Sequence, residues 1–341
     1  MAWYQYRLPG DSEAIRGEGE CVAGIASHGF TFAPFIAEDR SDIRSIIPHI
    51  ETVFTPSVPQ NRDTSHLTIE TSDEAFSHYG KAIREIQRFL ASDNPEGKVV
   101  FSRRVRIRER IDIQSTFDNL CYSYPDAFIF CFQTDEYGCW LGASPELLLE
   151  RREDCLRTMA LAGTRKSDTP VNTPWDIKNI EEQKIVTDYI CHMFRKNGLT
   201  PVTGKLKTLK AGPVEHLCTP IESYIGADTS TAGIFDIASF LCGYSPTPAL
   251  CGSETRKELP LIENLEEMPR ELYGGWCGPT YTDGFRYFVN LRSAKISDDG
   301  RPTLYVGGGI TMKSDARSEW EETIRKASTL SSTLLLNFNK F

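Results

Sequence analysis

Apolar residues in the middle of the chain form short runs that end at turn-forming residues. Runs at 126–132 (DAFIFCF), 139–149 and 156–162 are separated by the clusters TDEYG and ERRED. Runs of this length predict β-strands, and short connections predict antiparallel neighbours. Nearer the C-terminus, GGWCGPTY, FRYFVNLRSAKI and PTLYVGGGI continue the pattern, with TDG and DDG as the turns. The sequence therefore predicts two antiparallel meanders.

Two other segments have the spacing of amphipathic helices. Between residues 177 and 197, apolar residues fall on one helical face and charged residues on the other. The apolar face comprises Ile185, Val186, Tyr189, Ile190 and Met193, and the charged face Lys184, Asp188 and Arg195. Gly198 is expected to end this helix, and a last helix is expected from Ser314 or Asp315 to beyond Leu330.

Strands outnumber helices and mostly follow one another, which predicts an α+β fold with extensive antiparallel sheet. The 341 residues suffice for one large domain or two closely packed halves. Two polar segments with prolines, 54–66 and 165–176, are expected to be loops. Neither is long enough to separate independent domains, so we expect a single large domain.

Charge and cysteine usage narrow the classes of function. The net charge of −9 argues against binding to nucleic acid, which requires clustered Lys and Arg, but not against a small anionic substrate. The ten cysteines include no CxxC pair, so we expect reduced thiols and no zinc site. The N-terminus does not resemble a signal peptide, and no apolar stretch is long enough to span a membrane. We therefore expect a cytoplasmic protein without a membrane partner.

Two candidate acid–base groups lie in apolar surroundings. Lys98 begins KVVFSR, and Glu146 lies within SPELLLE. Charged side chains are seldom buried without a role, and burial disfavours their charged forms. A buried lysine can then act as a base and a buried glutamate as an acid. The local sequence is equally compatible with an exposed lysine at a strand start and a carboxylate at a strand edge.

Three glutamates are candidate ligands of a divalent cation. Glu319 and Glu322 share a face of the predicted last helix, and Glu182 lies on the inward face of the helix at 177–197. Carboxylate oxygens are the ligands that magnesium prefers. The alternative for Glu319 and Glu322 is a solvent-exposed face, on which Glu322 and Lys326 form an ordinary i, i+4 pair.

Groups suited to an anionic substrate occur near the C-terminus. The glycines at 307–309 follow an apolar strand, and glycines let backbone amides approach an anion closely. Arg292 is expected on a strand, on the same face as Phe288 and Asn290. Arg292 and Lys326 supply positive charge for carboxylates. The isolated His216 is compatible with a structural role and with a catalytic one.

Nine segments, in order, resemble those of the chorismate-utilising enzymes, a family that includes isochorismate, salicylate, anthranilate and aminodeoxychorismate synthases. They are KVVFSRR (98–104), GASPELLLE (142–150), LAGTR (161–165), EEQKIVTDYI (181–190), EHLCTPIE (215–222), SPTPALCG (245–252), RELYGGWCG (270–278), NLRSAK (290–295), and YVGGGI through EWEET (305–323). The N-terminal hundred residues match only vaguely.

The resemblance implies one unit of large antiparallel sheets in a two-layered core with helices outside. Residues 1–97 would form its N-terminal part and 98–341 its chorismate-binding catalytic region. It also implies chorismate as the small-molecule substrate and magnesium as the cofactor, bound between the halves. We expect a monomer or a weak dimer.

The resemblance also implies roles for single residues. Lys98 matches the water-activating lysine and Glu146 the general acid. Glu182 and Glu322 match the metal carboxylates, with Glu319 as an outer, water-mediated one. The matching substrate contacts are Ala162, Gly163, Thr164, His216, Thr247, Tyr273, Arg292, Gly307, Gly308, Gly309 and Lys326.

Individual positions distinguish members of the family. Relatives that use ammonia tend to have glutamine where Lys98 stands, and aminodeoxychorismate enzymes tend to have a nucleophilic lysine where Ala162 stands. Salicylate-forming relatives tend to carry Thr-Ala where this chain has Ala249-Leu250. These positions favour magnesium-dependent isochorismate synthase. Salicylate synthase, anthranilate synthase and a non-catalytic chorismate-binding subunit are the alternatives, and the use of the product for menaquinone, a siderophore or salicylate stays open.

Overall fold

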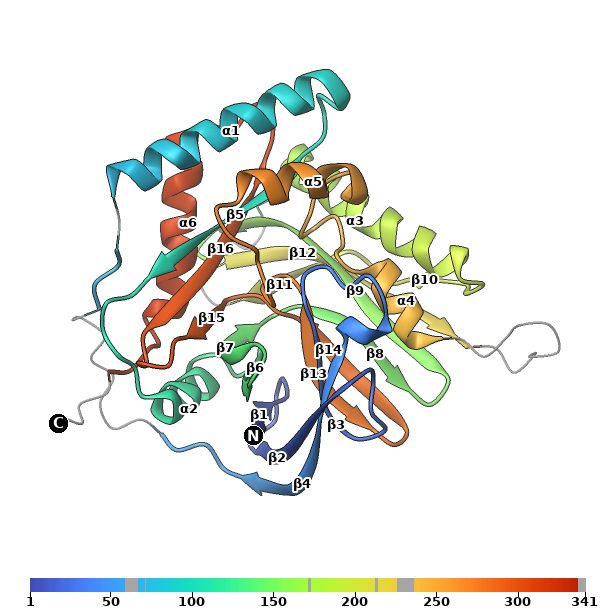
Figure 1. The fold of residues 1–341 in the computed structure, drawn as a ribbon. Helices are drawn as coiled ribbons and strands as arrows, with labels where there is room; N and C mark the ends of the chain where they lie inside the picture. The colour runs from blue at the N-terminus through green and yellow to red at the C-terminus, as the bar shows by residue number, and fades with distance from the viewer. Residues whose placement is uncertain (59–66, 71, 171–172, 212–213, 226–235, 337–341) are drawn as a thin grey trace.

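The structure is a computed structural model that describes residues 1–58, 67–70, 72–170, 173–211, 214–225 and 236–336 (Figure 1). Within these residues, sixteen strands form one sheet in which all neighbours are antiparallel, with six α-helices around it. The helices are α1 (Asp73–Asp93), α2 (Ile113–Ser123), α3 (Ile177–Lys196), α4 (Ile237–Tyr244), α5 (Thr255–Leu265) and α6 (Ala316–Ser331), with a 3-10 turn at Arg40–Asp42.

The strands follow the order β10-β12-β9-β8-β14-β13-β3-β4-β2-β1-β6-β7-β15-β16-β5, and β11 pairs with β12. The N-terminal strands β1 to β4 therefore occupy the middle of the sheet. Their bounds and those of the other strands are β1 (Ala2–Arg7), β2 (Ala14–Ala23), β3 (Gly29–Ala33), β4 (Arg44–Phe54), β5 (Val99–Arg106), β6 (Phe128–Thr134), β7 (Gly138–Ser144), β8 (Leu147–Arg152), β9 (Cys155–Lys166), β10 (Val202–Thr203), β11 (Lys207–Ala211), β12 (Val214–Tyr224), β13 (Trp276–Tyr281), β14 (Gly284–Val289), β15 (Ser293–Ile296) and β16 (Pro302–Ile310).

The sheet folds back on itself around an aromatic layer. Phe128 of β6 stacks on Phe288 of β14 with ring centroids 4.2 Å apart, and Phe132 lies 5.1 Å from Phe30 of β3. Neither β14 nor β3 is a sheet neighbour of β6. Alternate residues of a strand share a face, so Phe128, Phe130 and Phe132 all enter this layer. The predicted α+β fold, with two layers in one domain, is confirmed.

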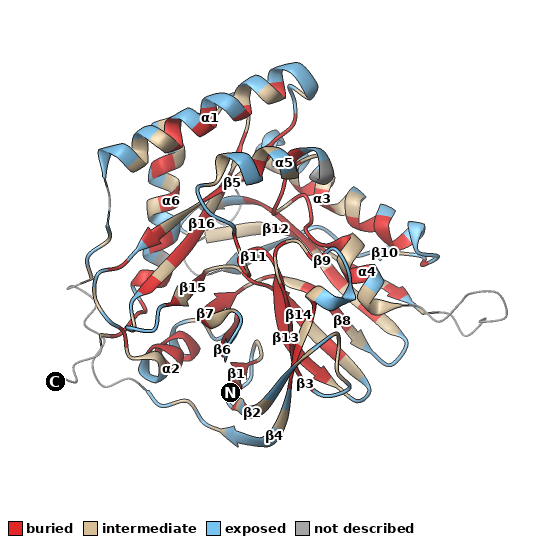
Figure 2. Ribbon diagram, in the orientation of Figure 1, coloured by how far each residue is buried: buried red, intermediate tan, exposed pale blue. Residues whose placement is uncertain are grey.

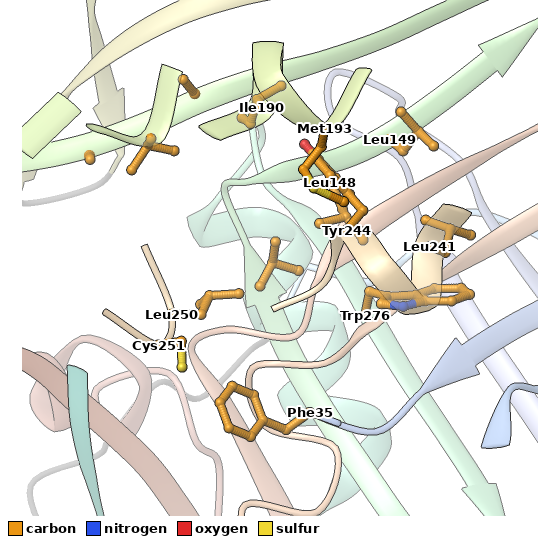
Figure 3. Close-up of a cluster of buried hydrophobic side chains, with 14 of the residues drawn as sticks. Phe35, Leu148, Leu149, Ile190, Met193, Leu241, Tyr244, Leu250, Cys251 and Trp276 are labelled. Carbon is orange, nitrogen blue, oxygen red and sulfur yellow. The ribbon is translucent and has the colours of Figure 1, made fainter. Parts of the chain in front are cut away.

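Helices cover the outer faces of the folded sheet. In Figure 1, α1 crosses α6 at the end of the sheet formed by β16 and β5, whereas α3 packs on β9 and β12. Figure 2 shows that each helix has a buried and an exposed face, as expected for an amphipathic helix. Figure 3 shows how Ile190 and Met193 of α3 meet Leu241 and Tyr244 of α4 beside Leu148 of β8. None of the helices in the described ranges has the length and apolarity needed to cross a bilayer, and all ten cysteines are free thiols.

Local periodicity predicted the two helices well. Helix α3 occupies 177–196, with Val186, Ile190 and Met193 buried, and α6 begins directly after Asp315. Of the two expected loops, 54–66 is coil from Thr55, with 59–66 outside the described residues. Strand β9 extends through Lys166 into the other loop, of which 171–172 lie outside the described residues.

Two runs that the sequence predicts as continuous strands are each divided into two strands in the structure. The run 139–149 is divided into β7 and β8 by Pro145-Glu146, and the run 285–296 is divided into β14 and β15 by residues 290–292. Strand β7 pairs with β6 and β15, whereas β8 pairs with β9 and β14. At both breaks the chain therefore leaves one half of the sheet for the other. Arg292 has a φ of 48° and does not share a strand face with Phe288.

Candidate active site

The two crossings between halves of the sheet place Glu146 and Arg292. Val289 N–H donates to the carbonyl of Glu146 at 3.0 Å, where β14 ends beside the first crossing. Ala143 N–H donates to the carbonyl of Arg292 at 3.2 Å, so the second crossing runs beside the end of β7. These backbone bonds hold an acidic and a basic side chain at the seam between the halves.

Lys98 lies immediately before β5 and is buried, with 6% of its surface exposed. Its backbone N–H donates to Ser253 Oγ at 2.9 Å, and its carbonyl accepts from Ser253 N–H at 3.0 Å. Its Nζ donates to Glu182 Oε1 on α3 at 2.5 Å. The alternative of a solvent-exposed lysine at a strand start is therefore excluded.

Glu146 is equally buried, with 6% of its surface exposed. Burial raises the pKa of its carboxyl to about 8, and the positive charge of Lys98 opposes that shift. The carboxyl therefore carries a proton at pH 7. Because Lys98 acts on the pKa of Glu146, the amine and the acid belong to one electrostatic site.

The glycine run on β16 lies against the candidate carboxylates. A methyl group at Gly308 would lie 3.5 Å from Glu319 Oε2 and 3.9 Å from Glu322 Oε1. At Gly309 it would lie 3.5 Å from Cδ of Lys98 and 3.9 Å from Glu182 Oε1. The absence of side chains at these positions lets α3, α6 and β5 bring their charged groups close to the strand.

Glu319 and Glu322 form an acidic pair on α6, in a partly buried position. Burial, to which the charge of Glu322 adds, raises the pKa of Glu319. Burial also opposes ionisation of Glu322, but Lys326 Nζ, 2.8 Å away, outweighs it and the pKa of Glu322 is lowered. Two carboxylates that share a partly buried site favour a bound cation, and their oxygens suit magnesium. Glu319 and Glu322 therefore do not lie on a simple solvent-exposed face of the helix.

The three predicted metal carboxylates do not converge. No three Asp, Glu, His or Cys side chains in the described parts of the chain come close enough to share a metal ion. Glu182 is paired with Lys98, and Glu322 with Lys326. The donor chemistry fits magnesium, but a shared ion requires Glu182 and Glu322 to exchange their lysine partners for the cation. Glu319 has no lysine partner of this kind within the described residues.

Lys326 links α6 to the glycine run, because its Nζ also donates to the Gly307 carbonyl at 2.8 Å. Its side chain is 41% exposed. A half-exposed ammonium group at this point can exchange Glu322 and the carbonyl for an anionic ligand. Burial lowers the pKa of Arg292, with Tyr124 acting in the opposite direction. Arg292 thus supplies a largely desolvated positive charge at the same site.

His216 lies at an irregularity where β12 pairs with β9. Gly163 has a φ of 73°, and the register shifts between His216 and Leu217. Nδ1 of His216 donates to the Gly163 carbonyl at 3.0 Å and lies 3.1 Å from Thr164 Oγ1. Burial, followed by the charge of Arg292, lowers the pKa of His216 to about 4. The imidazole is therefore neutral at pH 7, with Nε2 as an acceptor.

The remaining predicted substrate contacts, Ala162, Thr247 and Tyr273, lie in different surroundings. Ala162 is buried in β9, directly before Gly163. Thr247 is 2% exposed, and its hydroxyl has no hydrogen-bond partner among the described residues, which leaves it able to bond a ligand. Tyr273 lies in the aromatic layer, where it stacks on Tyr305 at 5.5 Å.

Two polar residues that were not predicted as site residues, Asn179 and Gln183, support the site. Asn179 Oδ1 accepts from Thr164 N–H at 2.9 Å and so ties β9 to α3. Gln183 is 5% exposed and donates to Thr219 Oγ1 at 2.7 Å. The sequence does contain one indication for Gln183, because its amide falls on the mainly apolar, inward face of the helix. Nothing local indicated the role of Asn179, because its partner lies on another element.

Comparison with known proteins identifies the family. The profile of the family described as Chorismate binding enzyme matches residues 26–335. The chain belongs to this family of enzymes. The match extends well into the N-terminal region, where the sequence alone showed only a vague similarity. No other assignment is needed to explain the fold.

Relatives of this chorismate-binding enzyme include curated proteins and solved structures. The vibriobactin-specific isochorismate synthase of Vibrio cholerae is 26% identical over 324 residues, which cover 88% of this chain and 78% of that protein. Isochorismate synthase EntC of Escherichia coli is 30% identical over 245 residues, 68% of this chain and 61% of EntC. The structure of MenF, the menaquinone-specific isochorismate synthase of Escherichia coli, superimposes with a TM-score of 0.81 at 20% identity, covering 98% of this chain and 88% of MenF. The last comparison shows a common fold.

Proposed function

We propose that this chorismate-binding enzyme is an isochorismate synthase, which adds water to C2 of chorismate and releases the C4 hydroxyl. The relatives described above from Vibrio cholerae and Escherichia coli carry that name. The observation that carries the proposal is a buried amine beside a buried carboxyl whose pKa is about 8. Such a pair supplies the two proton transfers that the reaction requires.

Lys98 accepts a proton from the attacking water in this proposal. The amine must be uncharged to do so, whereas in the structure Nζ donates to Glu182 at 2.5 Å. Release of Glu182 leaves the nitrogen of Lys98 without that ion-pair partner. The buried amine then faces C2 with few competing water molecules.

Glu146 donates its proton to the C4 oxygen as that group departs. Burial keeps the carboxyl protonated at neutral pH, and a pKa of about 8 leaves it acidic enough to give up the proton. The ring double bonds shift between the two events, so water enters at C2 as water leaves from C4. Substrate and product are isomers, and no oxidant or second substrate is consumed.

The substrate carboxylates are held by the positive groups around β16. Arg292 offers a guanidinium fork, and Lys326 offers an ammonium group that already reaches the glycine run. Backbone amides of Gly307 to Gly309 can approach a carboxylate closely because no side chain intervenes. Neutral His216 can accept a hydrogen bond through Nε2 without repelling Arg292.

Magnesium is the cofactor that we propose for Glu182, Glu319 and Glu322. When bound, the ion supplies positive charge that neutralises the ring carboxylate of chorismate. The carboxylate of Glu319 is raised in energy by burial and by the charge of Glu322, which is the electrostatic condition that favours a cation there. If Glu182 held the ion, its carboxylate would no longer be available to pair with Lys98.

Two positions favour this reaction over those of related enzymes. Ala162 offers no amine where aminodeoxychorismate enzymes tend to carry a nucleophilic lysine, and Lys98 stands where ammonia-using relatives tend to carry glutamine. Ala249-Leu250 stands where salicylate-forming relatives tend to carry Thr-Ala. We therefore propose that turnover stops at isochorismate and does not continue to loss of pyruvate.

Removal of either acid–base group tests the proposal. Lys98→Ala and Glu146→Gln are each expected to lower turnover of chorismate by about 10²–10⁴-fold or more, because each removes one proton transfer. Loss of chorismate and formation of isochorismate would be followed by chromatography. Lys184→Ala and Glu181→Gln, at exposed positions of α3, are the matched controls and should keep full activity.

The circular dichroism spectrum of each variant should match that of the unmodified protein, so that lost turnover is not lost folding. Wild-type turnover in either Lys98→Ala or Glu146→Gln would refute the assigned roles. A protein that binds chorismate without converting it would instead be a non-catalytic subunit.

A further inference from the structure

A cavity of about 480 Å³ lies between α1, β5 and the segment that follows α5. Helix α6 closes one side with Trp320, whereas its neighbours Glu319 and Glu322 approach the glycine run. None of the proposed catalytic or metal-binding residues lines this cavity. Its walls include the aromatic rings of Phe101, Tyr305 and Trp320, and the charges of Glu319 and Glu322 act on Tyr79 in the same wall.

Two buried polar groups in the cavity wall have no partner in the described part of the chain. Tyr79 is 2% exposed, yet its hydroxyl makes no hydrogen bond. Nη2 of Arg103 is buried and makes none either. Leaving such groups unsatisfied is costly, most of all for a charged one. Each therefore lacks the hydrogen bond that a ligand reaching it through the cavity wall would supply.

Arg103 is held in a fixed position by its other contacts. Nε donates to Thr323 Oγ1 at 2.7 Å, and the guanidinium lies 3.6 Å above the ring of Trp320. Burial lowers the pKa of Arg103 to about 10, with Tyr79 acting in the opposite direction. The guanidinium is therefore charged at pH 7 and close to Tyr79, without a carboxylate partner among the described residues.

The cavity as a whole has a surplus of positive charge. Five arginines line it but only three glutamates, although the whole chain has a net charge of −9. Each glutamate is already paired: Glu266 with Arg270 at 2.6 Å, Glu267 with His78 at 3.3 Å, and Glu70 with Arg108 at 3.4 Å. Arg103 and the exposed Arg106 are left without a carboxylate in the part of the chain that is described.

We propose that this cavity binds a small carboxylate borne on a flat ring. The carboxylate would accept hydrogen bonds from Arg103 Nη2 and the Tyr79 hydroxyl, and the ring would pack among Phe101, Tyr305 and Trp320. Arginine matches a carboxylate geometrically, and aromatic walls favour a planar body. A bare inorganic anion would satisfy the charge but not the walls, which is why we propose the ring.

Calorimetric titration with benzoate as the probe tests the site. Wild-type protein is expected to bind benzoate at a single site, and Tyr79→Phe and Arg103→Met are expected to weaken binding by about tenfold or more, because each removes one bond to the carboxylate. Arg84→Gln, at an exposed position on α1, is the matched control and should bind as the wild type does. Inorganic phosphate should bind more weakly than benzoate.

Binding at the active site is distinguished by a further variant, Arg292→Gln. It should keep full affinity for benzoate even if it loses turnover of chorismate. Loss of benzoate binding in Arg292→Gln with retention in Tyr79→Phe and Arg103→Met would overturn the proposal, as would no binding to wild type at about 10 mM benzoate. Tyr79→Phe removes a single oxygen atom, so it tests the proposed carboxylate site even if Arg103→Met does not fold.

Discussion

Glu146 owes its chemistry to the point where the chain leaves one half of the sheet for the other. Pro145 and Glu146 separate β7 from β8, and the Val289 N–H bond fixes the backbone there. The carboxyl is buried at the seam, so its pKa rises to about 8 although the charge of Lys98 opposes the shift. The same seam carries Arg292, whose positive φ turns the chain back. One topological feature therefore places together an acid and the guanidinium that we propose binds the substrate.

The pH dependence of catalysis follows from the pKa of Glu146. Below about pH 8 the carboxyl holds the proton that it must donate, and above that pH it has lost it. We therefore expect kcat/KM for chorismate to fall about tenfold per pH unit above pH 8. Initial rates at low chorismate across this range would measure the effect. The small residual activity of Glu146→Gln should lack this decline, and a wild-type rate that stays constant well above pH 8 would contradict the assignment.

The residue types of the site could be predicted, but not their pairing. A lysine and a glutamate among apolar neighbours indicated burial, and both Lys98 and Glu146 are buried. The ion pair of Lys98 with Glu182 joins residues 84 positions apart, which no local pattern reveals. The unpaired groups of Tyr79 and Arg103 depend likewise on which elements meet.

Helix α3 connects the seam between the two halves of the sheet with the glutamates that we propose bind the cation. Asp176 caps its first turn by accepting from Asn179 N–H at 2.8 Å, and its second carboxylate oxygen accepts from the Asn179 side chain at 2.8 Å. Asn179 in turn bonds Thr164 N–H. The cap thus fixes both the start of the helix that carries Glu182 and its contact with β9.

Loss of this cap should be measurable as lost stability. Asp176→Ala is expected to lower the free energy of unfolding by about 1 kcal/mol, because a backbone N–H loses its partner. Asp176→Ser keeps a capping oxygen and should lose less. Urea denaturation would measure both. Asp188→Ala, at an exposed position of the same helix, is the control, and an equal loss in that variant would show that capping is not the cause.

At this scale the sequence predicted helices better than strand ends. The spacing of Val186, Ile190 and Met193 is a local signal, so α3 was found almost to the residue. The breaks in the runs 139–149 and 285–296 were not found, because they are set by which distant strands pair with each segment. Apolar residues lie on both sides of each break, so composition alone does not mark the crossing.

The whole molecule depends on its N-terminal strands. Strands β1 to β4 lie between β13 and β6, so they join the two halves of the sheet. Tyr4, Tyr6 and Phe30 also contribute to the aromatic layer. The groups to which we assign catalysis lie beyond residue 97, but the scaffold that joins the two halves of the sheet begins at residue 2.

Residues 98–341 alone are therefore expected not to fold. Without β1–β4, strands β13 and β6 would each have an unpaired edge and aromatic side chains would be exposed, which promotes aggregation. Near-ultraviolet circular dichroism and gel filtration would compare this fragment with the full chain. Co-expression with residues 1–97 should restore at least part of the folded protein. A monomeric fragment with the native near-ultraviolet spectrum would contradict the expectation.

Identification of the product that the pure protein forms from chorismate is the most direct test of the proposed reaction. With magnesium present and ammonia absent, we expect isochorismate as the only product, no pyruvate, and no conversion once the metal is chelated. Release of pyruvate with salicylate, a requirement for ammonia with formation of an aromatic amine, or unchanged turnover without a divalent metal would contradict it.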